Sequence, residues 1–330
     1  MKRSILGIGI ESSCDETAVA VVKDGREIVS NIIASQIDLH REYYGVVPEI
    51  ASRAHLETIN VIIGRALDAA AIAFGDLDYV AATNRPGLVG SLLIGLQSAK
   101  VISFVLGIPL VGVHHLEAHL YAPFLEGNDP AFPYIGLLVS GGNTALFHAR
   151  GIGDWDIIGR TADDAVGEAF DKIAKYLGLG YPGGPLIEKL AARAAGRQVM
   201  FPKILPGPGE VRFSYSGIKT AVINYLKQHP DADRAEVVYG FQERALEILV
   251  RRTFAAARSL SVKRIVVAGG VAANGRLREL LALGKRPDET ILIPSPVLCT
   301  DNAAMVAGIG YHYFRSGRTD SFSLDVHARA

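Results

Sequence analysis

The sequence is poor in cysteine and carries no net charge. Only Cys14 and Cys299 occur among 330 residues, and there is no C-x-x-C pair. Neither a disulfide framework nor a cysteine-based zinc site is therefore indicated. Lysine and arginine together number 34, as do aspartate and glutamate. Because no global positive field draws this chain to nucleic acid, any contact with RNA has to come from a local basic patch or from a partner subunit.

Long hydrophobic runs are also missing. The apolar start of the chain is interrupted at Glu11, which is too early for a signal peptide. No window has the roughly 18 unbroken apolar residues that a membrane span needs. We therefore expect a cytoplasmic protein. With 330 residues, of which 49% are hydrophobic, the chain is long enough for about two domains with buried cores.

Two stretches of the sequence share the pattern of strand, polar turn and strand. The first covers residues 4–22 around a turn rich in serine, aspartate and threonine. The second covers residues 134–149 around the turn Ser140-Gly-Gly-Asn-Thr144. Each pattern is typical of a β-hairpin, and its repetition indicates an internal duplication of one β-turn-β unit.

Helices and strands alternate after each hairpin. Pro48 begins a long amphipathic helix, and strands near residues 79–82 and 110–113 follow. The order predicts an α/β fold of two lobes with a cleft between them. The N-terminal lobe comprises residues 1–132 and is completed by a C-terminal helix over 303–330. The C-terminal lobe comprises residues 133–302 and carries most of the candidate nucleotide-binding motifs.

A histidine-rich segment follows the strand at 110–113. At about 100° per residue of helix, His115 and His119 lie about 40° apart on one face, whereas His114 diverges. Two imidazoles one turn apart can hold a transition metal, and the first turn of a helix favours the neutral, ligating imidazole. The alternative is a pair of histidines hydrogen-bonded at a strand-helix junction. It stays open because two ligands do not make a site.

The sequence argues against a zinc protease. The H-E-x-x-H motif places a general-base glutamate directly after the first histidine, but Leu116 follows His115. Glu117 projects about 200° round the helix from His115. Peptidase chemistry is therefore not encoded in this segment.

Asp301 is a candidate for the third metal ligand. It precedes the last predicted helix, where most aspartates serve as N-caps, and both interpretations stay open. Two histidines and one carboxylate form the ligand set of non-haem iron, and zinc would also accept it.

Several glycine turns follow apolar strands. In Ser140-Gly141-Gly142, successive backbone N–H groups can point at an anion because glycine has no Cβ. Gly183-Gly184 and Gly269-Gly270 repeat the pattern. One such turn is a weak signal, but three indicate a nucleotide in the cleft. Glu168 and Asp171 share a helix face and could hold a ribose diol, or they form an ordinary solvated face.

Ten short motifs run through nearly the whole chain. They are residues 11–17, 44–49, 86–90, 114–119, 138–142, 167–172, 181–185, 213–217, 269–274 and 299–302. Their residues and their order resemble the TsaD family, whose members transfer a threonylcarbamoyl group to tRNA and were formerly described as glycoproteases.

The resemblance implies a two-lobed actin/Hsp70/sugar-kinase-like fold. It implies transfer of the threonylcarbamoyl group from threonylcarbamoyl-AMP to N6 of adenosine 37, in tRNAs that read codons starting with adenine, with release of AMP. The implied partners are the tRNA, a TsaB-like paralogous subunit on the first lobe and a TsaE-like ATPase, with no membrane.

The resemblance also assigns site residues. One divalent metal ion per subunit, Fe2+ in preference to Zn2+, would be held by His115, His119 and Asp301, and Mg2+ could accompany the nucleotide. Glu11 and Asp15 would handle charge at the reacting carbonyl. The residues implied to bind the adenylate are Leu138, Val139, Ser140, Gly141, Gly142, Asp171, Gly184, Glu188 and Asn274.

The chain departs from the family pattern at a few positions. Asn84 and Arg85 precede Pro86 where relatives carry small residues, so a charged side chain is expected near the phosphates. Asn143 replaces a histidine that is common in bacterial members. Leu138 stands where archaeal relatives place a metal-binding tyrosine, so no fourth protein ligand is expected.

Two other functions are compatible with the same superfold. In a sugar or small-molecule kinase, the two hairpins would bind ATP and Mg2+ and an aspartate would act as the base. The histidine pair would then have no role. A non-catalytic scaffold subunit would be expected to lose His115, His119 or Asp301, and all three are present.

Overall fold

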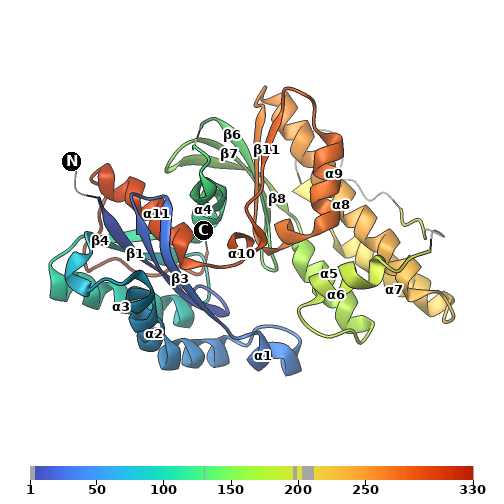
Figure 1. Ribbon diagram of the computed structural model, residues 1–330. Coiled ribbons are helices and arrows are strands. Elements are labelled where there is room, and N and C mark those ends of the chain that lie inside the picture. The colour runs from blue at the N-terminus through green and yellow to red at the C-terminus, as the bar shows by residue number, and fades with distance from the viewer. Residues whose placement is uncertain (1–3, 130, 196–198, 203–211, 330) are drawn as a thin grey trace. The chain divides into compact units, whose positions relative to one another are not determined.

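The computed structural model describes residues 4–129, 131–195, 199–202 and 212–329 (Figure 1). The chain divides into two compact units, Met1–Pro130 with Thr300–Ala330, and Ala131–Cys299. The predicted boundaries, after residues 132 and 302, lie close to these positions, but Asp301 belongs to the first unit. The cleft predicted between the lobes stays a prediction.

The first unit is built on five strands: β1 Leu6–Glu11, β2 Glu16–Lys23, β3 Glu27–Ser35, β4 Tyr79–Arg85 and β5 Leu110–His114. They form one sheet in the order β3-β2-β1-β4-β5. The first three strands are antiparallel, and β4 and β5 run parallel to β1. Their many valines and isoleucines favour extended backbone and fill the buried faces of the sheet.

Helices α2 Pro48–Ala70 and α3 Val89–Leu106 cover one face of this sheet and share a core with it. Pro48 stands in the first turn of α2, where its missing N–H costs no hydrogen bond. By length and composition alone α3 could cross a membrane, but it packs against β4 and α2, and core helices pass the same test. The shorter segments are α1 Ile37–His40, η1 Arg41–Tyr43, η2 Phe74–Asp76, α4 His115–Tyr121 and η3 Ala122–Glu126.

Helix α11 Ala303–Arg315 lies against β1 on the opposite face, although the two are far apart in sequence (Figure 1). A Cβ on Gly9 would stand 2.4 Å from the Ala303 carbonyl oxygen, so glycine is what permits this close approach. The predicted helix over 303–330 is wrong in extent. It ends at Arg315, and Gly317 follows with a φ of 77°, a left-handed conformation in which the helix cannot continue.

The second unit repeats the topology of the first. Its strands are β6 Tyr134–Val139, β7 Thr144–Gly151, β8 Asp154–Thr161, β9 Arg212–Phe213, β10 Arg264–Ala268 and β11 Thr290–Leu292. The sheet order is β11-β10-β6-β7-β8-β9, with β6, β7 and β8 antiparallel and β10 parallel to β6. The predicted duplication of a hairpin-led core is confirmed. Strand β8 is not predicted because it is only partly buried and lacks a clear apolar alternation.

The helices of the second unit enclose its core. They are α5 Val166–Tyr176, α6 Gly183–Ala191, α7 Ser216–Gln228, α8 Arg234–Ser259, η4 Gly270–Ala273, α9 Gly275–Gly284 and α10 Pro296–Cys299. The glycine turn predicted at Gly183-Gly184 is part of a helix. Gly183, Gly184 and Pro185 already form the first turn of α6, where proline and glycine are tolerated.

Candidate functional site

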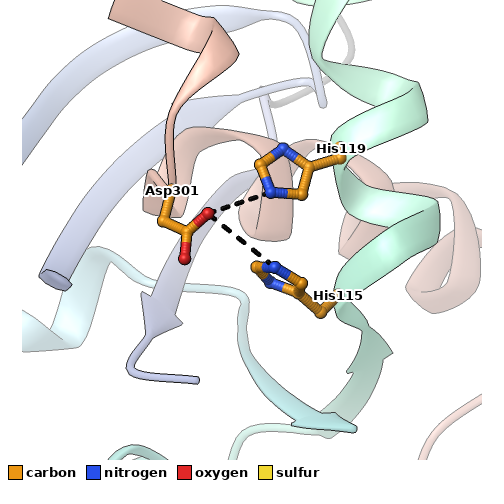
Figure 2. A group of neighbouring side chains, drawn as sticks. All are labelled: His115, His119 and Asp301. Atoms are coloured by element: carbon orange, nitrogen blue, oxygen red, sulfur yellow. Dashed lines mark hydrogen bonds and ion pairs between the residues drawn. The ribbon is translucent and has the colours of Figure 1, made fainter. Parts of the chain in front are cut away.

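Three predicted ligands come together in the first unit. Strand β5 runs directly into α4, so that His115 and His119 project from successive turns with ring centroids 4.6 Å apart. The Oδ1 atom of Asp301 is 3.0 Å from His119 Nε2 and 3.8 Å from His115 Nε2 (Figure 2). The donor atoms lie within 4.8 Å of one another. Because metal-ligand bonds are about 2 Å long, donors this close can share one ion.

Helix α11 is capped by Asn302 and not by Asp301. The Asn302 side chain accepts a hydrogen bond of 3.1 Å from Met305 N and so caps α11. Asp301 is therefore not the cap, and its carboxylate is left to face the two histidines. The close packing of Gly9 on Ala303 brings residue 301 to the end of β1, which explains how residues about 180 positions apart become neighbours.

Glu11 lies behind His115 and is fully buried. Its Oε2 accepts hydrogen bonds from Thr83 Oγ1 at 2.6 Å and from His115 Nδ1 at 3.0 Å, and its Oε1 accepts one from Ser13 N at 2.7 Å. A carboxylate on one ring nitrogen fixes the tautomer and leaves the other nitrogen free to bind a metal. The cluster thus has the donor set and the supporting carboxylate of a metal centre.

The electrostatics of the cluster differ from the expectation. Burial opposes a charged His115, but the carboxylates of Glu11 and Asp301 outweigh it and raise the pKa of His115 to about 9. Against the same opposition from burial, the two histidines lower the pKa of Asp301 to about 2. The prediction that the helix start keeps His115 neutral is wrong, because two carboxylates outweigh the dipole of a seven-residue helix. A metal ion would displace this proton.

Asp15 lies in the turn between β1 and β2, partly exposed. Within the described part of the chain, its side chain makes no hydrogen bond or ion pair to the three clustered residues. Burial and the carboxylates of Asp301 and Asp15 raise the pKa of the adjacent Glu16 to about 10, so this carboxyl is protonated near neutral pH. Burial likewise raises the pKa of the Cys14 thiol, which makes it a poor nucleophile.

The other polar residues of α4 and its surroundings have structural contacts. Glu117 accepts a hydrogen bond from the Tyr313 hydroxyl of α11, in agreement with its predicted direction away from the ligands. Burial and the Arg85 guanidinium lower the pKa of His114 to about 3, and His114 is not part of the cluster. The Asn84 amide donates to the Asp325 carbonyl at 3.1 Å, so it holds the C-terminal segment.

The glycine turn of the second unit is open. Ser140 N donates to Asn143 O at 2.8 Å, and Asn143 N donates to Ser140 Oγ at 3.0 Å, which closes the turn. A Cβ on Gly141 or Gly142 would meet nothing within 4 Å, whereas one on Gly167 would stand 2.6 Å from the Ser140 carbonyl oxygen. The turn therefore backs onto the start of α5 and leaves one side accessible.

The remaining predicted adenylate residues lie in segments that contact one another. Asp171 Oδ1 accepts from Gly183 N at 2.7 Å, and Glu188 Oε1 accepts from Gly275 N at 2.7 Å. Asn274 caps α9 by accepting from Leu277 N at 2.9 Å. These side chains order the helix starts next to the glycine segments. A Cβ on Gly184 would meet nothing within 4 Å, so this position is open.

The structure limits what Leu138, Val139 and Glu168 can contribute to ligand binding. The side chains of Leu138 and Val139 are fully buried in β6, so a ligand there could reach only their backbone. Glu168 forms an ion pair with Lys172 at 2.8 Å and accepts from Ala165 N at 3.3 Å. Its alternative as an ordinary capping and solvated residue is therefore the better description.

Sequence reasoning missed Ser13, Thr83 and His55 as supporting residues. Ser13 Oγ is 3.2 Å from His115 Nδ1, and Thr83 bonds Glu11 from the end of the neighbouring strand. The carboxyl ends of the parallel strands β1, β4 and β5 meet at one edge of the sheet. The signal that could have found Thr83 is its position at the end of an apolar strand.

Solved structures define the fold class. HypF in its phosphate- and nucleotide-bound form superposes with a TM-score of 0.64 at 15% identity, covering 97% of this chain and 57% of that one. Component A of the Acidaminococcus fermentans (R)-2-hydroxyglutaryl-CoA dehydratase gives a TM-score of 0.56 at 18% identity, covering 94% and 98%. These likenesses concern the fold alone. The predicted two-sheet α/β fold of the actin/Hsp70/sugar-kinase class is confirmed.

Sequence relatives identify the family. The family model described as "TsaD: tRNA N6-adenosine threonylcarbamoyltransferase" matches residues 27–308. A protein with that transferase name from Symbiobacterium thermophilum is 51% identical over 324 residues, 97% of this chain and 94% of the relative. One from Geotalea uraniireducens is 49% identical over 327 residues, 98% and 95%. The chain belongs to the TsaD family, as its motifs predict, and this membership favours a transferase over the kinase alternative.

Proposed function

We propose that this chain transfers the threonylcarbamoyl group from threonylcarbamoyl-AMP to N6 of adenosine 37, in tRNAs that read codons starting with adenine. Family membership supports the reaction class. The observation that carries the site is the convergence of His115, His119 and Asp301, with Glu11 behind His115. A subunit that had become a scaffold would have no need to keep this arrangement.

The reaction is an acyl transfer in which the N6 amine attacks the carbamoyl carbon. A new N–C bond forms, the C–O bond to phosphate breaks, AMP leaves with the bonding electrons, and N6 loses a proton. When bound, a divalent ion would polarise the carbonyl as a Lewis acid or would bind and orient the phosphate. Two imidazoles and one carboxylate favour one Fe2+ per subunit over Zn2+.

Glu11 and Asp15 have different proposed roles in this reaction. Both oxygens of Glu11 are already bonded inside the protein, so Glu11 orients His115 rather than touching the substrate. Asp15 is the partly exposed carboxylate of the same turn, which supports a role in handling charge at the reacting carbonyl. A buried, hydrogen-bonded Glu11 also keeps the histidine tautomer constant through the reaction.

The adenylate is assigned to the glycine segments of the second unit. The open Gly141 and Gly142 offer backbone N–H groups to a phosphate, and Gly184 offers a second open position. Asp171, Glu188 and Asn274 hold the neighbouring helix starts, and their side-chain oxygens are the proposed acceptors for ribose hydroxyls. Ser140 with the backbone of Leu138 and Val139 completes this assignment, and Mg2+ could accompany the nucleotide.

A TsaB-like subunit is the proposed partner of the first unit. Large apolar side chains are exposed on α2 and α3, among them Leu56, Val61, Val101, Phe104 and Val105, and Phe322 packs its ring 5.8 Å from that of Phe104. An exposed apolar surface of this kind is typical of a protein interface. A TsaE-like ATPase, a cytoplasmic location and the absence of a membrane are proposed with it. Cys14 and Cys299 form no disulfide, which agrees with a reducing compartment.

Reconstitution tests the proposal. The purified chain, its TsaB-like partner, synthetic threonylcarbamoyl-AMP and unmodified tRNA are combined, and the nucleosides are measured by mass spectrometry. We expect threonylcarbamoyladenosine at position 37 and an equal amount of AMP. Donor hydrolysis without tRNA modification, or ATP consumption that depends on a hexose, would contradict the proposal and favour the kinase.

A further inference from the structure

The turn between β1 and β2 is held at four consecutive residues by three parts of the first unit: the start of α3, helix α2 and the segment before α1. Ser12 Oγ donates to Ser91 O at 2.8 Å, Leu88 N donates to Ser13 O at 2.8 Å, His55 Nε2 lies 3.0 Å from Cys14 O, and Gln36 N donates to Asp15 O at 2.9 Å. Three of these contacts use a backbone amide or a serine hydroxyl. The fourth depends on the side chain of one histidine from the middle of α2.

His55 is fully buried and bonds on both ring nitrogens. Its Nε2 contacts the Cys14 carbonyl, and its Nδ1 lies 2.7 Å from Thr17 Oγ1 at the start of β2. A carbonyl oxygen only accepts, so Nε2 has to carry the proton. Burial lowers the pKa of His55, which keeps the ring neutral. Nδ1 is then an acceptor for the Thr17 hydroxyl.

The two contacts of His55 flank Asp15 in the sequence. One is to the carbonyl of residue 14 and the other to the side-chain hydroxyl of residue 17, so a single rigid ring contacts the chain on both sides of the carboxylate. The same turn supplies Ser13, whose N–H bonds Glu11 and whose hydroxyl is 3.2 Å from His115 Nδ1. A shift of this turn would move Asp15 and disturb the groups behind His115 together.

We propose that His55 is a positioning residue for the transfer reaction, fixing the turn that carries Asp15 against the cluster of His115, His119 and Asp301. This inference rests on the proposed function. His55 does not touch the substrate and acts through the backbone at Cys14 and the hydroxyl of Thr17. Its loss affects the rate of transfer more than the binding of metal or substrate, because only the placement of the reacting groups changes.

Two variants separate the contacts of the ring. In His55→Gln the amide nitrogen reaches as far as Nε2 and can still donate to the Cys14 carbonyl. In His55→Asn the shorter amide can accept from Thr17 but cannot reach Cys14. Ile62→Ala is the matched control, because Ile62 is buried on the same helix in the core of the same unit, and its apolar side chain can form no hydrogen bond with the turn.

The experiment measures kcat and KM for donor and tRNA, bound metal and melting temperature for all three variants. We expect His55→Asn to lower kcat about 100-fold, with KM and metal content close to wild type. We expect His55→Gln to recover most of that loss, and Ile62→Ala to keep kcat at a similar or lower melting temperature. Equal kcat in the Asn and Gln variants would overturn the proposal, as would rates that simply follow the melting temperature.

A spectroscopic measurement keeps this inference separate from the proposed function. Nitrogen-15 NMR of histidine-labelled protein should show His55 as the neutral tautomer protonated on Nε2, with that signal lost in His55→Gln. If His55 were an imidazolium, or carried its proton on Nδ1, the proposed contacts of His55 with Cys14 and Thr17 would be wrong even if the enzyme is active. If the wild-type protein modified no tRNA, the proposed function would be wrong. The tautomer of His55 would still show whether the ring makes its contacts with Cys14 and Thr17.

Discussion

The hairpins β1–β2 and β6–β7 occupy corresponding places in their sheets, of which the second has the additional strand β9, but their turns are built in opposite ways. The turn at residues 12–15 is anchored at each residue and is surrounded by buried carboxylates and imidazoles. The turn at residues 140–143 is closed by its own serine and asparagine, accepts one hydrogen bond from Gly167 N at 3.3 Å and exposes two glycines. One topology thus supports a rigid, charged site suited to a cation and an open, uncharged turn suited to an anion.

The difference follows from the segment that packs behind each turn rather than from the order of the strands. In the first unit, Gly9 allows α11 to pack so closely that Asp301 reaches the histidines. In the second unit, the corresponding close approach is that of Gly167 to the Ser140 carbonyl, which brings a helix start behind the turn. A helix start adds partial positive charge, and a carboxylate adds negative charge. The identity of the neighbouring segment therefore decides which ion each turn can accept.

The largest effect is expected from removing both histidines of the charged site. His115→Ala with His119→Ala leaves a single carboxylate, which cannot hold a transition metal, so both bound metal and tRNA modification should be lost. Metal is measured by elemental analysis and modification by nucleoside mass spectrometry. His114→Gln is the control, because His114 lies outside the cluster and its loss should spare the metal. Activity retained in a metal-free double variant would contradict the assignment.

A smaller effect is expected from Glu11→Gln. The variant keeps the size of the side chain but removes the charge that His115 Nδ1 meets at 3.0 Å. Loss of such a supporting carboxylate typically weakens metal binding about 10- to 100-fold. Metal titration of the purified variant measures this loss of metal affinity. Thr83→Val, which removes a bond to the same oxygen without changing charge, should have a weaker effect; equal affinities in wild type and Glu11→Gln would refute the role.

The role of the glycine turn at residues 140–143 in phosphate binding can be tested without changing the turn at residues 12–15. In Gly142→Val the new Cβ stands where no protein atom lies within 4 Å, so we expect folding to be unaffected. Blocking a phosphate contact should raise the KM or Kd for the donor about 10- to 100-fold, the equivalent of one or two hydrogen bonds to a charged group. Metal content should not change. Gly64→Ala is the control, since Gly64 is equally open but lies within α2, where alanine stabilises the helix.

The smallest effect concerns the stability of the metal-free protein as a function of pH. The folded pKa of His115, about 9, is above its ordinary value of 6.5, so its stabilisation is fully present below pH 6.5 and is lost as pH rises through about 9. It amounts to at most about 3 kcal/mol. Melting of chelator-treated protein between pH 6 and 10 should therefore fall more steeply than that of His115→Gln. Parallel curves would contradict the assignment, and Gly142→Val should follow the wild type.

Much of the fold could be predicted from the sequence because its signals are local. Apolar alternation located the hairpins, and helical spacing located α2 from its first residue, Pro48. The His115/His119 pair follows from the helical period alone. Strand β8 could not be predicted in the same way, since its side chains are only partly buried and do not alternate clearly between apolar and polar.

The sequence by itself determined the family, the order of the motifs and which residue types could bind a metal or a phosphate. Only the tertiary structure decided how they are used. It made Asn302 the helix cap and left Asp301 as a ligand candidate, it turned Glu11 inward onto His115, and it raised the pKa of that histidine instead of lowering it. The physical reason is that caps, hydrogen bonds and pKa values depend on which distant groups pack within a few ångströms, and spacing along the chain does not contain that information.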